Sequence, residues 1–133
     1  MMNLKTFFTI NTVMFIPFGI EMLIIPSTIF NMLDVILDSD GLLMASMVGS
    51  MLLSFGLVCF IARGFEGVST ALQAVLLGNL TFHVIDSILT FKGAFSGEMN
   101  NLAYVFSTMH LLFAIGFLFF YLRYKPTRIA TNN

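Results

Sequence analysis

The sequence has few charged residues, no tryptophan and a single cysteine. Its 6 Lys/Arg and 7 Asp/Glu make up 10% of 133 residues, against about 25% in soluble domains. So few charges cannot hydrate a whole surface, which excludes a water-soluble fold. The formal net charge is −1 and no basic block occurs, so nucleic-acid binding has no electrostatic basis. The lone Cys59 excludes an intramolecular disulfide.

Four long apolar runs, separated by short breaks with charge or glycine, make up most of the chain. A transmembrane helix needs about 20 apolar residues, and in lipid the backbone must satisfy its own hydrogen bonds. The runs therefore predict an all-α, polytopic four-helix bundle with short loops, forming one domain over residues 1–133. The predicted spans are about residues 6–28, 41–62, 68–91 and 102–124, followed by a flexible cytoplasmic tail at 125–133. The first run is longer than the apolar region of a signal peptide and is interpreted as a retained helix.

Lysine and arginine are distributed unevenly between the breaks. Five of the six lie on the side that both termini share, and one lies on the other side. Cytoplasmic loops are enriched in these residues, so a multi-pass protein of the cell membrane with both termini in the cytoplasm is predicted. The five are Lys5, Arg63, Arg123, Lys125 and Arg128, and the sixth is Lys92.

The connector at residues 26–40 is long for a turn and is predicted to form a short interfacial helix on the outer side. Asp34 and Asp38 would share one face of it at a spacing of four. Such a segment is either a solvated cap or a lid over an outward-facing pocket.

Small residues recur along the second span. Ala45, Gly49 and Gly56 belong to stripes of the small-xxx-small type, which let helix backbones approach closely in lipid. The second span is therefore predicted to be central in the bundle.

Four ionisable side chains lie inside the predicted spans: Glu21 in the first, His83 and Asp86 in the third, and His110 in the fourth. At 1.5 Å per residue, they lie roughly 8–12 Å below the outer ends of their spans. Asn79 shares a helix face with His83 and Asp86. Ionisable groups inside a bilayer are costly and usually mark a site. The four ionisable residues are predicted to form one polar cluster in the outer half of the membrane, and Asn79 is a further candidate for ligand binding or proton coupling.

The cluster admits several functions. It can hold the helices in register without any ligand. A carboxyl group in a low dielectric can exchange protons near neutrality, as in a proton-coupled small-solute transporter. A redox protein is a further alternative: Glu21, His83, Asp86 and His110 are competent ligands for a divalent metal, and the two histidines for bis-histidine haem ligation. Acid–base catalysis is the last alternative.

No phosphate loop, nucleophile elbow or zincin motif occurs in the sequence. The prediction therefore leans away from an enzyme. It favours a non-enzymatic binding or accessory subunit with a polar intramembrane pocket for a small or lipophilic ligand. Its expected partners are the lipid bilayer and either other membrane subunits or further copies of itself.

Residues 19–26 (GIEMLIIP), residues 49–56 (GSMLLSFG) followed by Ala62 and Arg63, and the histidine-bearing third and fourth spans carry a resemblance. The chain resembles small four-helix bacterial integral membrane proteins over nearly its whole length. The resemblance implies that architecture and no particular activity. It does not extend to the small drug exporters, whose tryptophan-rich pattern is missing, or to the fluoride channels, whose glycine-asparagine-arginine motifs are missing.

Overall fold

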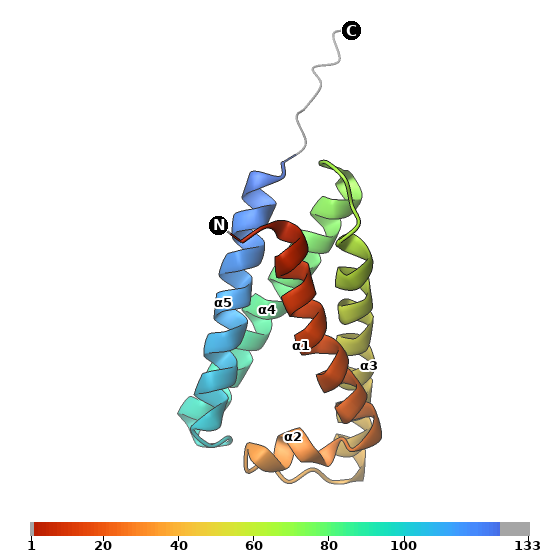
Figure 1. Ribbon diagram of the computed structural model, residues 1–133. Coiled ribbons are helices and arrows are strands. Elements are labelled where there is room, and N and C mark those ends of the chain that lie inside the picture. Colours follow the sequence, from red (N-terminus) through yellow and green to blue (C-terminus); the bar gives the residue numbers. More distant parts are fainter. Residues whose placement is uncertain (1, 126–133) are drawn as a thin grey trace, which may run out of the picture.

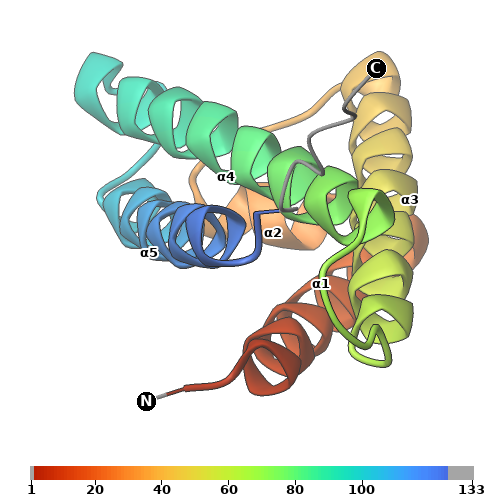
Figure 2. The ribbon, with the colours of Figure 1, turned by 90° about the horizontal axis from the view of Figure 1, so that it is seen from above.

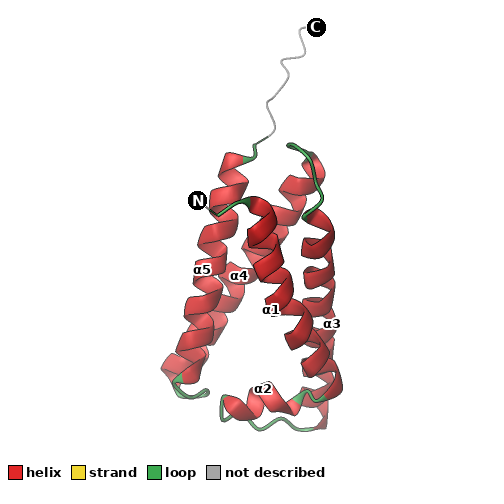
Figure 3. Ribbon diagram, viewed as in Figure 1, coloured by secondary structure: helices red, strands yellow, loops and turns green. Residues whose placement is uncertain are grey.

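A computed structural model describes residues 2–125, and all its regular structure is helical (Figure 3). Four helices are long and apolar enough to cross a membrane, as the sequence predicts. Apart from Lys125, the predicted tail at 125–133 lies outside the described residues. The five helices are α1 (Leu4–Ile24), α2 (Ser27–Met32), α3 (Ser39–Ala62), α4 (Thr70–Ser96) and α5 (Leu102–Arg123).

Three of the long helices begin at a side-chain cap. The side chains of Asn3, Asp38 and Ser69 accept hydrogen bonds from the backbone N–H groups of the first turns of α1, α3 and α4. These caps satisfy donors that have no partner within the helix. The sequence thus marks where each of these three helices starts.

Two helices end a few residues away from the ends of the predicted spans. The first span stops at Ile24 rather than at residue 28, because Pro26 follows and the preceding Ile25 has a non-helical backbone (φ −135°, ψ 68°). The third span continues past Lys92 to Ser96. It stops at Gly97, which has a left-handed backbone (φ 78°). Lysine does not end a helix, whereas a left-handed glycine does.

The connector between α1 and α3 forms a shorter helix than predicted. Only Ser27–Met32 is helical, and the chain then turns at Asp34, which has a φ of 61°. Asp38 caps α3 instead. Asp34 and Asp38 therefore do not share a helix face.

The long helices pack as two pairs. α1 packs chiefly against α3, and α4 chiefly against α5. Figure 1 shows α1 and α5 close together near the N-terminus and apart at the other end, where α2 lies across the gap. Viewed from above, α4 and α5 lie on one side of the molecule and α1 and α3 on the other (Figure 2). The prediction that the second span is central is wrong, because its small residues serve one neighbour, α1.

Glycine sets the close approach of α1 to α3. A Cβ atom at Gly19 would lie 2.7 Å from the backbone nitrogen of Leu53 and 2.9 Å from the carbonyl oxygen of Gly49. The other pair is joined by hydroxyl groups. Ser87 Oγ donates to the carbonyl of Ser107 at 3.0 Å, and Ser107 Oγ donates to that of Ser87 at 2.8 Å. Each pair is therefore tightly joined within itself.

Two apolar clusters lie between the helix pairs, one toward each end of the molecule. We call the end near the N-terminus the aromatic half and the end near α2 the α2 half. The buried residues of the aromatic half are Leu4, Phe7, Phe8, Cys59, Ala62, Leu72, Leu76, Phe117 and Phe120. Those of the α2 half are Phe15, Met22, Ile29, Leu33, Ala45, Leu52 and Ala103.

Candidate functional site

A cavity of about 270 Å³ lies in the α2 half, between the two helix pairs. All five helices contribute to its wall, which is almost entirely apolar. Val48 of α3 and Leu89 of α4 line it and are also exposed at the surface. Its polar lining consists of Asp86, Thr90 and His110.

Asp86 and His110 begin a hydrogen-bonded chain that leads from the cavity into the core. Asp86 Oδ2 lies 2.9 Å from His110 Nε2. The other ring nitrogen of His110, Nδ1, lies 2.9 Å from His83 Nδ1. The Asp86 side chain is 34% exposed and that of His110 is 9% exposed, whereas His83 is fully buried. The chain thus connects the cavity wall with the centre of the bundle.

The hydrogen-bonded chain ends at three buried residues, one each from α1, α3 and α4. His83 Nε2 lies 3.0 Å from Asn11 Oδ1. Asn11 Nδ2 in turn donates to Cys59 Sγ at 3.2 Å and to Asn79 Oδ1 at 3.5 Å. Asn79 Nδ2 donates to the carbonyl of Val75 at 2.9 Å. No buried side-chain nitrogen or oxygen of residues 2–125 lacks a partner.

Aromatic rings hold the His83 imidazole in place. It stacks on Phe15, Phe113 and Phe117, with ring centroids 5.2, 5.0 and 5.4 Å away. Phe82 meets it edge-on at 5.4 Å. The imidazole is therefore closed off from solvent, and within residues 2–125 its hydrogen-bond partners are His110 and Asn11.

The structure brings together four of the five site residues predicted from the sequence: Asn79, His83, Asp86 and His110. Glu21 does not join them. Its partly exposed carboxylate makes no hydrogen bond or ion pair within residues 2–125. Glu21 follows Gly19 by two residues and so lies on roughly the opposite side of α1 from the face that packs on α3.

Asn11 and Cys59 are members of this network that the sequence reasoning missed. The sequence prediction rests on ionisable groups and on the helix face that Asn79 shares with two of them, and it treats Cys59 only as a disulfide partner. A usable signal was present, because Asn11 is the only side-chain amide in α1. A buried amide needs hydrogen-bond partners as much as a charged group does.

The arrangement does not fit the predicted metal or haem ligands. Both ring nitrogens of His83 and of His110 are already hydrogen-bonded. An iron ion held between two imidazoles would separate their nitrogens by roughly 4 Å, twice a metal–nitrogen bond of about 2 Å, yet the two Nδ1 atoms are 2.9 Å apart. Within residues 2–125, no group of three His, Cys, Asp or Glu could hold a metal ion.

The hydrogen-bonded chain stops inside the protein. Beyond Asn79 and Val75, toward the N-terminal end, lie the fully buried side chains of Phe8, Leu72 and Leu76 in the aromatic half. The described residues provide no polar partner that would continue the chain through this layer. The geometry favours a polar site on one cavity over a relay that crosses the bundle.

The α2 segment closes the end of the cavity. Ile29, Phe30 and Leu33 contribute to its wall. Asn100, in the turn between α4 and α5, fastens this segment: its Nδ2 donates to the Met32 carbonyl and to Asp34 Oδ2, both at 2.9 Å. Of the two sequence interpretations of this connector, the cap and the lid, this position agrees with a lid.

No protein-family model, curated protein or solved structure matches this chain.

Proposed function

We propose that this chain is a multi-pass membrane protein that binds a small lipophilic molecule in the cavity of the α2 half. The cavity itself carries the proposal, because it is an apolar chamber with one fixed polar pair, Asp86 and His110, in its wall. Small-molecule sites typically combine an apolar lining with a few polar groups, in volumes of about 300–1,000 Å³. A volume of about 270 Å³ suits a compact ligand.

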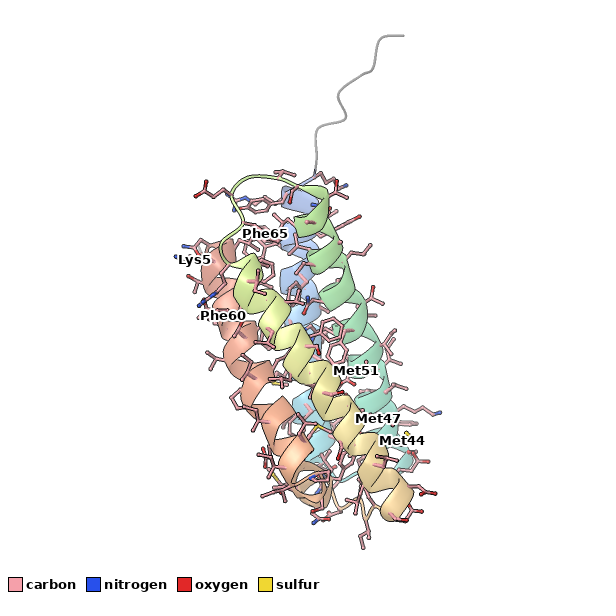
Figure 4. All side chains as sticks on the ribbon, turned by 90° about the vertical axis from the view of Figure 1, so that its right-hand side faces the viewer. Lys5, Met44, Met47, Met51, Phe60 and Phe65 are labelled. Carbon is pink, nitrogen blue, oxygen red and sulfur yellow. The ribbon has the colours of Figure 1, made fainter. Side chains whose placement is uncertain are left out.

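The molecular surface supports placement in a membrane. Three methionines along α3 are 51–56% exposed: Met44, Met47 and Met51 (Figure 4). Many other large apolar side chains on the long helices are exposed as well. In water these would form an unfavourable surface, whereas lipid tails are a suitable solvent for them.

The charged residues support one orientation. Lys5, Arg63, Arg123 and Lys125 all belong to the ends of helices at the aromatic half, and Lys92 lies toward the other end of α4. Under the positive-inside rule, the aromatic half faces the cytoplasm and the α2 half faces outward. The cavity then lies in the outer half of the bilayer, and its exposed lining residues Val48 and Leu89 border lipid.

The experiment uses 2-naphthol, a compact apolar body with one hydroxyl group, as the probe. The purified protein in detergent micelles is dialysed to equilibrium against protein-free micelles, and the excess naphthol per protein is measured. Leu52→Phe fills the cavity, because Leu52 lines it. Leu57→Phe is the matched control, because Leu57 lies on the same helix and is 49% exposed.

We expect the wild type and Leu57→Phe to bind one naphthol per chain and Leu52→Phe to lose at least tenfold in affinity. Equal binding by Leu52→Phe and the wild type would show that the probe sits elsewhere and would contradict the proposal. Circular dichroism of each variant confirms that the helices are retained.

A further inference from the structure

The hydrogen-bonded chain has a direction, which the Val75 carbonyl sets. That carbonyl can only accept, so Asn79 presents its Nδ2 to Val75 and its Oδ1 to the other side. Asn79 Oδ1 can only accept in turn, so Asn11 faces it with Nδ2. Asn11 Oδ1 is then left facing His83 Nε2. Each amide orientation is fixed by the one before it.

The direction continues through both imidazoles. Because Asn11 Oδ1 accepts, His83 carries its proton on Nε2. His83 is fully buried with no carboxylate beside it, so a second proton and a positive charge on this ring would be costly. Its Nδ1 is therefore an acceptor, and His110 donates to it from Nδ1–H. The remaining nitrogen of His110, Nε2, faces Asp86.

One proton must then lie between His110 Nε2 and Asp86 Oδ2, which are 2.9 Å apart. Without it, two acceptors would face each other. The proton resides either on the carboxyl group, giving two neutral partners, or on the ring, giving an imidazolium–carboxylate pair. In both cases the pair has no net charge and the other carboxyl oxygen, Asp86 Oδ1, is an acceptor.

The other polar groups in the cavity wall also have no free proton. Thr90 Oγ1 donates its hydrogen to the Asp86 carbonyl at 2.7 Å, so it can offer only a lone pair to the cavity. Both ring nitrogens of His110 are engaged. No ionisable side chain of residues 2–125 other than His83 is bonded to the Asp86–His110 pair. The polar lining of the cavity thus consists of acceptors only.

We infer that the cavity selects uncharged lipophilic molecules that carry a hydrogen-bond donor, such as a hydroxyl or amide N–H group, and rejects anionic or acceptor-only head groups. This inference rests on the proposed function and names the ligand class of that same site. The neutral Asp86–His110 pair offers no counter-charge for an anion. The donor of the ligand bonds to Asp86 Oδ1, and its apolar body fills the remaining space.

Two probes of similar size test the inference. 2-Naphthol carries a donor, whereas 2-methoxynaphthalene carries only an acceptor. Their affinity ratio is measured by the same dialysis in the wild type, in Asp86→Asn and in Asp86→Leu. Taking the ratio in Asp86→Leu as the reference removes the difference in partition between the two probes.

The two variants separate the role of the oxygen from that of the charge. In Asp86→Asn, the amide Nδ2 can donate to His110 Nε2 and leave Oδ1 free, which reproduces the arrangement without a shared proton. A single hydrogen bond typically changes affinity by about 3- to 10-fold. Relative to Asp86→Leu, we expect the preference for naphthol to be about tenfold in the wild type and to stay within threefold of that in Asp86→Asn, whereas a wild-type ratio equal to that of Asp86→Leu would overturn the donor rule.

The outcomes distinguish the inference from the proposed function. If both probes bind equally well and Leu52→Phe weakens both, the cavity binds ligands but the donor rule is overturned. If Asp86→Asn loses the preference, the placement of the proton is overturned. If neither probe shows binding that depends on Leu52, the proposed function fails and the inference fails with it.

Nitrogen NMR tests the direction of the chain without any ligand. The protein contains 2 histidines, so ¹⁵N-labelled histidine gives two ring systems to assign. We expect a neutral His83 protonated on Nε2 and a His110 ring protonated on Nδ1. A neutral His110 protonated on Nε2 alone would overturn the direction and, with it, the ligand class.

Discussion

The two halves of the molecule contain similar apolar residues but pack them differently. In the aromatic half, Phe7 lies 4.7 Å from Phe117 and 5.2 Å from Phe120 between ring centroids, and all three rings are buried. In the α2 half, Phe18 and Phe106 meet at 6.2 Å, are only partly buried and line the cavity. The difference follows from the divergence of α1 and α5 (Figure 1), which leaves a space that side chains fill only in part.

This contrast suggests that the aromatic half stabilises the fold and that the α2 half provides the binding cavity. The aromatic half holds the two helix pairs together through close ring contacts. The α2 half leaves the pairs apart and closes the space with α2. The buried network around His83 lies at the boundary, where Phe15 of the α2 half and Phe117 of the aromatic half stack on the same ring. Four substitutions test this division, in order of decreasing expected effect.

The largest effect is expected for Phe117→Ala. Phe117 is fully buried and its ring contacts Phe7, Phe8 and His83. Replacing a buried Phe by Ala typically costs about 3–5 kcal/mol. We expect the free energy of unfolding, measured by SDS titration in mixed micelles, to fall by about 3 kcal/mol. Phe106→Ala, in the cavity wall, is the matched control and should cost about 1 kcal/mol because fewer contacts are lost. Equal losses would contradict the division.

Gly19→Ala is expected to have a smaller effect than Phe117→Ala. It tests whether each helix pair is closely packed even in the α2 half. The added Cβ would meet backbone atoms of Leu53 and Gly49, which cannot rotate away. Overpacking of this kind costs about 1–3 kcal/mol, and we expect a loss of about 2 kcal/mol in the same titration. Gly78→Ala is the control, since a Cβ there meets nothing within 4 Å. A tolerated Gly19→Ala would mean that α1 and α3 are not held at this distance.

Asn11→Leu breaks the network at the boundary between the halves. It leaves His83 Nε2 and Asn79 Oδ1 without their Asn11 partner. Polar contacts between membrane helices are worth about 0.6 kcal/mol on average, and an unpaired buried group costs more. We expect a loss of about 1 kcal/mol and a change in the ¹⁵N signals of His83. Thr9→Leu, at a residue whose hydroxyl bonds only to its own helix, should leave both unchanged. Unaltered His83 signals in Asn11→Leu would contradict the network.

The smallest effect is expected for Asn100→Ala, which releases the lid without touching the core. The variant loses the bonds to Met32 and Asp34 and the bond that Asn100 Oδ1 accepts from the Leu102 N–H, which together are worth about 0.5–1 kcal/mol. Hydrogen exchange of the Asp34 and Val35 amides should rise by about 2- to 5-fold. Amides of the aromatic half should be unaffected. Asn101→Ala is the control, since the Asn101 side chain makes no cap bond. Equal exchange in the two variants would show that Asn100 does not fasten α2.

The sequence alone predicts the helices well because their signals are local. Long apolar runs favour helices, and the charges between them separate the four helices that are long and apolar enough to cross a membrane. At two helix ends the backbone geometry differs from the predicted spans: the first span runs past Pro26, and the third is ended at the charge of Lys92 although the helix continues to Ser96. Within one helix, the face shared by Asn79, His83 and Asp86 also follows from the 3.6-residue period.

Which helices meet is not a local property. The sequence places Glu21 and His110 at similar depth, yet depth carries no information about rotation or about which neighbour a helix takes. Gly19 and Gly49 bring α1 onto α3, and that pairing turns Asn11, rather than Glu21, toward His83. The sequence by itself determined four apolar helices and the few polar groups within them. Only the tertiary structure decided which of those groups meet and where a cavity remains, because both depend on how the two helix pairs diverge.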